Sequence, residues 1–194
     1  MKRFAALILA LALCLSLIPA ALASEPDSKP SSEPEELTEL KELKDYTYES
    51  AWEVITTNMW EGVSCSVNEA KLKFWLPAGV VRMELTEKAK AAGYLISYGA
   101  PDLLLIVSYM DYDGISLEEY LEIVTDSGYE NARMEEVNGI DTVIYDEPQE
   151  DGTLCRVAAS VAENGRFLEF VYRTNDSRLD FAINVSIATI RPRE

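Results

Sequence analysis

Carboxylates are the side chains in this sequence with the clearest capacity for chemistry. Asp111 and Asp113 stand on alternate positions ahead of Gly114, and oxygen ligands at a glycine turn suit calcium. The rest of an EF-hand loop does not follow them. The same two acids fit the end of a strand and the approach to a helix N-terminus, where the helix dipole favours negative charge. We favour this structural role and keep a calcium site at Asp111 and Asp113 as the alternative.

Other enzymatic chemistry has little support in the sequence. The chain contains no histidine, which removes Ser-His-Asp and Cys-His mechanisms and zinc sites with histidine ligands. No Walker-type phosphate loop, GxGxxG motif after a strand or CxxC pair is present, so nucleotide binding and dithiol redox chemistry are not indicated. A small hydrolase that uses paired carboxylates stays as an alternative, although 34 acidic residues bring some carboxylates together by chance. We therefore predict no catalytic residues, and no cofactor apart from calcium at the site considered above.

Two cysteines, Cys65 and Cys155, follow the N-terminal segment, and an exported protein can join such a pair in a disulfide. This bridge would close a long loop and stabilise the fold by about 2–4 kcal/mol. However, Cys155 alternates with Val157 and Ala159 along one strand face, which suits a small buried hydrophobic side chain. We favour two buried thiols over the disulfide.

Aromatic residues gather near the start of the predicted domain and suit either a core or a binding surface. Exposed aromatics combine contact area with a polar edge, as carbohydrate- and peptide-binding sites require. Burial is the commoner outcome, and we expect it for each of them. We expect the first helix to cover Trp75. The residues concerned are Tyr46, Tyr48, Trp52, Trp60 and Trp75.

The N-terminal residues indicate export. Lys2 and Arg3 precede an apolar run, and Ala21 and Ala23 form an A-x-A cleavage site. We predict a signal peptide over residues 1–23, an acidic linker rich in Ser, Pro and Glu over residues 24–44, and one α+β domain over residues 45–194. The expected location is secreted or extracellular, with no membrane insertion after cleavage.

The charge of the chain bears on its partners. Removal of Lys2 and Arg3 leaves 15 of the 17 basic residues against 34 acidic ones, a formal net charge of −19. Such a surface repels nucleic acid and anionic lipid, and the sequence contains no evident basic patch. We therefore expect a protein or envelope component as partner, and no nucleic acid.

Periodicity and capping signals predict the elements that must hold these residues. Apolar spacing indicates a helix that begins near Tyr48, alternation indicates a strand over residues 71–76, and a short helix fits residues 86–93. Strands follow over residues 94–98 and 103–109, and the second is apolar on both faces, so we place it centrally in a sheet. Ser116 and Glu119 form a capping box for a helix that ends at Gly128.

Turn dipeptides predict a meander in the second half of the chain. Asn138-Gly139 and Asn164-Gly165 suit two-residue hairpin turns, whereas Pro148 turns the Asp151-Gly152 connection into a longer loop over residues 147–152. Centring the last hairpin on Asn164-Gly165 predicts three apolar cross-strand pairs. These pairs are Val161 with Leu168, Ala159 with Phe170, and Val157 with Tyr172.

A final helix completes the predicted architecture. Ser177 and Asp180 resemble a cap, and the apolar positions after them mark a helix that stops before Pro192. An antiparallel sheet with a central strand that is apolar on both sides needs cover on both faces. The predicted fold is therefore α+β, an α/β/α sandwich with helices on both faces of an antiparallel sheet.

The order of these elements resembles the PsbP-like α/β/α sandwich of extrinsic photosystem subunits and secreted bacterial relatives. The resemblance spans residues 71–191 and rests on a strand with Leu76-Pro77, the helix SLEEYL from Ser116, the turn VNG from Val137, an aromatic strand over residues 167–172 and a terminal helix. It implies a non-enzymatic binding or assembly protein and supplies no ligand residues. Our leading hypothesis is an extracellular binding module; a carboxylate-dependent hydrolase and a calcium-stabilised surface protein are the alternatives.

Overall fold

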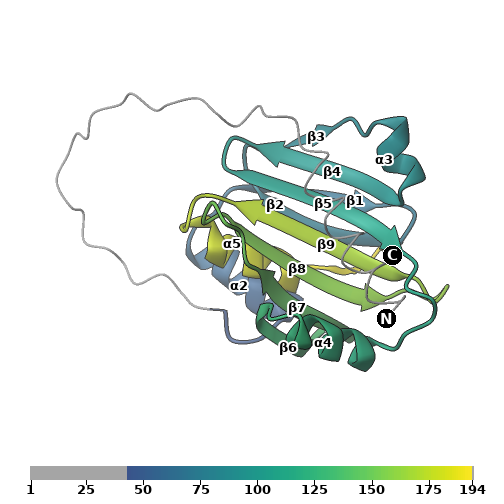
Figure 1. Cartoon of the computed structure of the whole chain (residues 1–194). Coiled ribbons are helices and arrows are strands. Elements are labelled where there is room, and N and C mark those ends of the chain that lie inside the picture. Colours follow the sequence, from purple (N-terminus) through teal and green to yellow (C-terminus); the bar gives the residue numbers. More distant parts are fainter. Residues whose placement is uncertain (1–42, 194) are drawn as a thin grey trace.

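A computed structural model describes residues 43–193 (Figure 1); the predicted signal peptide and all but the end of the predicted linker lie outside the described residues. A seven-stranded antiparallel sheet has the order β3-β4-β5-β9-β8-β7-β6, and a three-stranded antiparallel sheet has the order β1-β2-β10. The strands are β1 (Gly62–Val67), β2 (Leu72–Pro77), β3 (Val81–Met83), β4 (Tyr94–Ala100), β5 (Leu103–Met110), β6 (Glu130–Val137), β7 (Ile140–Glu147), β8 (Leu154–Val161), β9 (Phe167–Thr174) and β10 (Arg191–Pro192). The helices are α2 (Tyr48–Thr57), α3 (Glu87–Ala91), α4 (Leu117–Asp126) and α5 (Leu179–Ala188).

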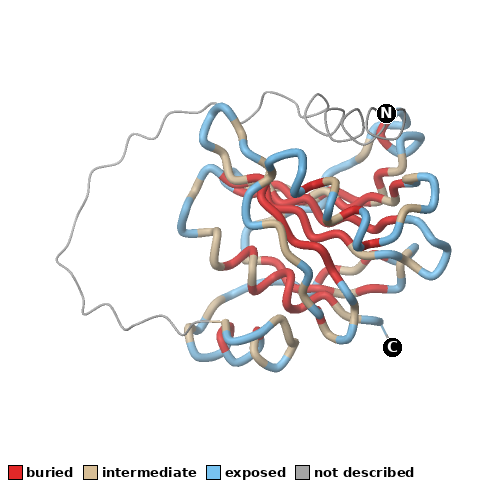
Figure 2. Tube along the Cα trace, turned by 60° about the horizontal axis from the view of Figure 1, so that its bottom comes forward, coloured by how far each residue is buried: buried red, intermediate tan, exposed pale blue. Residues whose placement is uncertain are grey.

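Both faces of the large sheet are covered. The small sheet and α5 lie over one face, and α4 packs on β6 and β7 at the other face. Figure 2 shows the buried residues running along the central strands, with the exposed ones in the turns and outer surfaces. The predicted α+β class and the antiparallel sheet are confirmed. β5 is an interior strand with buried residues on both faces, as its continuous apolar run predicts.

The helix α4 begins and ends where its sequence signals predict. Ser116 Oγ accepts a hydrogen bond from the Glu119 N–H at 3.1 Å, and the Glu119 carboxylate accepts one from the Ser116 N–H at 2.8 Å. This reciprocal pair satisfies two backbone donors that the helix start leaves open. Gly128 has a φ of 80°, the left-handed conformation that ends many helices. The predicted capping box and C-terminal glycine are confirmed.

The hairpin between β6 and β7 also agrees with its turn sequence. Asn138 and Gly139 have φ values of 49° and 80°, and Val137 lies opposite Ile140. Positive φ at both central residues matches the right-handed twist of the strands. The connection between β7 and β8 is a longer loop, as predicted from Pro148.

The predicted register of the β8–β9 hairpin is wrong by one residue. Val161 lies opposite Phe167, and Ala159 lies opposite Glu169. Ala162 N–H donates to the Arg166 carbonyl at 2.9 Å, so three residues, ending in Gly165 at φ 76°, form the loop. A three-residue loop with a left-handed glycine shifts the pairing by one position relative to a two-residue turn.

The start of α5 and two short strands differ from the sequence prediction. No side chain caps α5, because the Asp176 carboxylate instead accepts from the Arg178 N–H, and the Asp180 carboxylate binds Arg156. The predicted Ser177–Asp180 cap is therefore wrong. The strands β3 and β10 were not predicted, since three and two residues are too few to show alternation.

Candidate functional site

The acidic pair Asp111 and Asp113 lies in the exposed connection between β5 and α4. Asp111 Oδ1 accepts a hydrogen bond from the Asp113 N–H at 3.2 Å, and Asp113 has a φ of 57°. The first acid therefore holds the turn. Across residues 43–193 no three acidic, cysteine or histidine side chains are grouped to hold a metal ion. Among the described residues, no third carboxylate, cysteine or histidine joins Asp111 and Asp113 as a calcium ligand, and the calcium site stays a hypothesis.

The two cysteines are buried thiols in different layers. Cys65 lies in the layer between the two sheets, where burial raises the pKa of its thiol. Cys155 lies on the α4 side of the large sheet, where its thiol donates to Glu147 Oε2 at 3.7 Å. The disulfide considered from the sequence is not formed, because the sheet separates the two side chains.

The sequence analysis missed a buried carboxyl group, Glu169, in the central strand β9. It is 1% exposed and lies on the α4 side of the large sheet. Glu169 Oε1 accepts hydrogen bonds from the hydroxyls of Tyr112 at 2.7 Å and Tyr120 at 2.9 Å. The Tyr120 and Tyr145 hydroxyls are 2.9 Å apart. The shifted β8–β9 register places this acid between apolar residues.

Burial raises the pKa of Glu169, because the apolar surroundings disfavour its charged form. The tyrosine hydroxyls oppose this rise, since they donate to the carboxylate. Ser108 lies directly opposite in β5 and also lowers the pKa, although its hydroxyl lacks a hydrogen bond of regular geometry to any described residue. An acid with a raised pKa is one of two features that the hydrolase alternative requires; the other is a pocket that reaches it.

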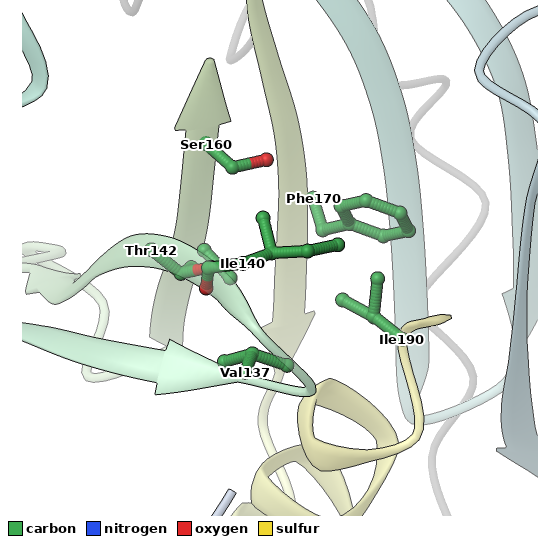
Figure 3. A pocket seen from close by; sticks show the side chains of 7 residues that line it. Val137, Ile140, Thr142, Ser160, Phe170 and Ile190 are labelled. Atoms are coloured by element: carbon green, nitrogen blue, oxygen red, sulfur yellow. The ribbon is translucent and has the colours of Figure 1, made fainter. Parts of the chain in front are cut away.

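A small cavity on the other side of the large sheet does not reach Glu169. It lies between β6, β7, β8, β9 and the residues that follow α5 (Figure 3). Ile140, Phe170 and Ile190 make it largely apolar, and Thr142 and Ser160 contribute hydroxyls. The space open to the centre of a water molecule is about 10 Å³, which is room for about one water. This cavity is too small for a substrate.

A second hollow of about 200 Å³ lies on the surface beside β3 and α3. Met83, Leu85 and Leu95 form its apolar part, and the charges of both signs come from Arg82, Glu84 and Lys90. Lys90 is already paired with Glu87 at 2.7 Å. The hollow therefore has no dominant charge and no buried titratable group to act on a ligand.

A partly buried ionic network joins the large sheet to α5. Arg156 binds Asp146 through two hydrogen bonds of 2.7 and 2.9 Å, and it also contacts Asp180 and Asn184. Tyr46 donates to the same Asn184 oxygen at 3.1 Å. These groups satisfy one another's charges and hydrogen bonds, and their role is to fix the position of α5.

The aromatic residues divide between core and surface. Trp75 is buried against α2, as predicted, and Trp60 stacks on it with ring centroids 6.3 Å apart. Tyr46, Tyr48 and Trp60 are half-buried, and Trp52 is 46% exposed, so the expectation of burial is wrong for Trp52 and met in full by Trp75 alone of the five. The helix α2 buries Ala51 and Val54 instead, which turns Trp52 outward.

Trp52 belongs to a surface platform. Tyr48, one helical turn earlier, stacks on it with ring centroids 5.8 Å apart and planes inclined by 16°. The Arg191 guanidinium lies over the Tyr48 ring, 3.2 Å from its centroid. Such a cation–π contact holds the arginine and the ring in place.

Basic residues extend this platform along the small sheet. Arg191 in β10 lies opposite Lys73 in β2, and the Arg193 N–H donates to the Lys71 carbonyl at 2.7 Å. Paired residues in an antiparallel ladder point to the same side of the sheet. We define the basic-aromatic strip as Tyr48, Trp52, Lys71, Lys73, Arg191 and Arg193.

The strip differs in charge from the chain as a whole. None of its four basic residues forms an ion pair with another described residue. Lys71 and Arg193 are exposed, and Lys73 and Arg191 are half-buried. The sequence analysis missed this patch because Lys71 and Arg191 are far apart in the chain and only the β2–β10 pairing brings them together.

Comparison with known proteins gives a likeness of fold alone. No protein-family model and no curated protein matches the chain. The chain is similar to the solution structure of PsbP from the cyanobacterium Synechocystis sp. PCC 6803, with 14% sequence identity and a TM-score of 0.47 over 68% of this chain and 92% of that one. The sequence analysis named the same kind of protein as a resemblance.

Proposed function

We propose that the chain is a secreted, non-enzymatic binding or assembly module of the bacterial cell envelope, and that the basic-aromatic strip is its contact surface. The observation that supports this most is the strip itself. Four basic side chains without ion pairs among the described residues lie beside a stacked aromatic pair, in which Trp52 is exposed and Tyr48 half-buried, on a chain with an overall excess of acids. Charged and aromatic groups of this kind are typical of contact surfaces.

The remaining features agree with this proposal. The N-terminal residues predict export, and among residues 43–193 no helix is both long enough and apolar enough to cross a bilayer. The buried acid Glu169 accepts hydrogen bonds from Tyr112 and Tyr120, and the cavity shown in Figure 3 lies on the opposite face of the sheet. No observation favours the hydrolase or the calcium alternative over a binding module.

The proposal is tested by co-sedimentation of purified residues 24–194 with the envelope fraction of the source cells. We expect the protein to sediment with the envelopes, both with calcium and with a chelator. Lys73→Glu combined with Arg193→Glu should reduce the bound fraction about tenfold, because reversing two contact charges costs about 1–2 kcal/mol.

The matched control is Lys88→Glu combined with Arg166→Glu. These exposed residues lie on α3 and in the β8–β9 turn, outside the strip, and their replacement changes the net charge by the same amount. The control should sediment like the wild type. Loss of sedimentation in the chelator alone would support the calcium alternative, and no sedimentation in either condition would contradict the proposal.

A further inference from the structure

The basic-aromatic strip combines two recognition chemistries. Trp52 is 46% exposed and stacks on Tyr48, and Arg191 lies both over the Tyr48 ring and opposite Lys73. The apolar face of a sugar ring packs well on a flat aromatic side chain, whose polar edge stays available to water. Lysine and arginine side chains bind carboxylate and phosphate groups. A ligand that fills the whole strip therefore needs an apolar ring face and an adjacent anionic group.

The basic side of the strip is prepared for a short anionic ligand. Lys73 and Arg191 are opposite each other, and Arg193 follows two positions later. The Arg193 guanidinium donates to Asn68 Oδ1 at 2.7 Å, so one hydrogen bond already directs it. Because Arg191 is held over Tyr48, its side chain loses little further freedom when a ligand binds.

The charge of the rest of the protein limits the length of the ligand. Residues 24–194 carry a formal net charge of −19, so a long polyanion such as nucleic acid is repelled wherever it extends past the strip. At physiological salt, screening reduces this repulsion beyond about 8 Å. A short ligand with few charges therefore gains the local attraction without most of the repulsion.

We propose that the strip binds a short acidic saccharide, with one sugar ring on Trp52 and a carboxylate or phosphate group of the same ligand at Lys73 and Arg193. This inference rests on the proposed function, because it names the envelope chemistry that the module contacts. The stacked aromatic pair favours a glycan over an acidic peptide, since a ring face is the feature that a peptide of acidic residues lacks.

Isothermal titration of purified residues 24–194 with three defined probes tests the inference. Trigalacturonate carries carboxylates, glucose 6-phosphate carries a phosphate, and maltotriose is a neutral sugar. We expect one or both acidic probes to bind at least tenfold more tightly than maltotriose. If only one acidic probe binds, its anionic group identifies the source, carboxylate or phosphate.

Variants locate the binding. Trp52→Ala, and separately Lys73→Glu with Arg193→Glu, should each weaken the acidic probe about tenfold or more. The charge-matched control, Lys88→Glu with Arg166→Glu, should bind it like the wild type. Circular dichroism and the thermal midpoint of each variant show whether it is folded. We expect both variants to fold, because Trp52 and Arg193 are exposed and the half-buried Lys73 forms no ion pair among the described residues.

Three results would overturn the inference. They are the absence of binding by both acidic probes at millimolar concentration, equal binding of maltotriose, and tighter binding of a triglutamate peptide than of trigalacturonate. Each is distinguishable from failure of the proposed function, because envelope sedimentation can still depend on Lys73 and Arg193 when no saccharide binds. In that case the binding module stands and its ligand is not an acidic sugar.

Discussion

Glu169 shows how a single residue ties stability to pH. Its carboxyl group lies in the apolar layer under α4, and burial raises its pKa. In the folded protein it therefore holds its proton to a higher pH than in the unfolded chain, where the pKa is near 4.3. As pH rises from the unfolded pKa through the raised folded pKa, Glu169 lowers the free energy of unfolding. The decrease is about 1.4 kcal/mol for each pH unit by which the folded pKa exceeds the unfolded pKa.

Glu169→Gln should remove this loss. The amide retains an oxygen that accepts from Tyr112 and Tyr120, and its NH2 group can donate toward Ser108, whose hydroxyl lacks a regular hydrogen bond among the described residues. We expect the variant to be at least about 1 kcal/mol more stable than the wild type at pH 8, and the difference to vanish near pH 4. Urea unfolding across this pH range measures it.

The control for this prediction is Glu163→Gln in the exposed β8–β9 turn, which also removes one negative charge. Its effect should stay within about 0.5 kcal/mol at each pH. A Glu169→Gln variant that is less stable than the wild type at pH 8 would show that the charged carboxylate is the form that the fold prefers.

At the scale of elements, Asn138 joins three segments. Its Oδ1 accepts from the Tyr48 N–H at 2.6 Å, and its Nδ2 donates to the carbonyls of Ala188 at 2.8 Å and Ile190 at 2.7 Å. The turn between β6 and β7 thereby holds the start of α2 and the end of α5. Both segments adjoin the basic-aromatic strip, since Tyr48 begins α2 and Arg191 follows Ile190.

The substitution Asn138→Gly tests the contacts of this side chain apart from the turn that the residue forms. Glycine adopts the φ of 49° seen at Asn138 without strain, so the hairpin should persist while the three side-chain hydrogen bonds are lost. We expect the free energy of unfolding to fall by about 1.5–4 kcal/mol. Denaturant unfolding gives the value, and hydrogen exchange should increase first at the start of α2.

Asn164→Gly is the corresponding control, because Asn164 also precedes a turn glycine but its side chain binds only the nearby Arg166 N–H, at 3.1 Å. This substitution should lower the free energy of unfolding by less than about 1 kcal/mol. Equal costs for Asn138→Gly and Asn164→Gly would contradict the joining role of Asn138.

The elements themselves were largely predictable because their signals are local. The capping box of Ser116 and Glu119 and the Asn138-Gly139 turn act over a few residues, and both are confirmed. The register predicted from Asn164-Gly165 was wrong because this dipeptide fits both a two-residue and a three-residue loop. The shift of one residue places Glu169 opposite Ala159, on the apolar face of β8, where the predicted register had placed Phe170. The buried acid could therefore not be found from the sequence pattern.

At the scale of the whole molecule, the predicted α+β class and antiparallel sheet are confirmed, but the small sheet was not foreseen. Its strand β10 has two residues and pairs with β2, more than 100 residues earlier in the chain. The basic-aromatic strip depends on this pairing. A surface assembled from distant segments leaves no spacing pattern in the sequence, and the large acidic excess conceals a basic patch of four residues.

The most direct test is to observe which surface of the protein meets the envelope. Amide and indole signals of isotope-labelled residues 24–194 can be recorded by nuclear magnetic resonance while substoichiometric envelope fragments are added. We expect selective broadening of the Trp52 indole and of the amides of Tyr48, Lys73 and Arg193, with α3 unaffected. Broadening centred on the hollow beside β3 and α3, or uniform broadening that spares no surface, would contradict the assignment of the strip as the contact surface.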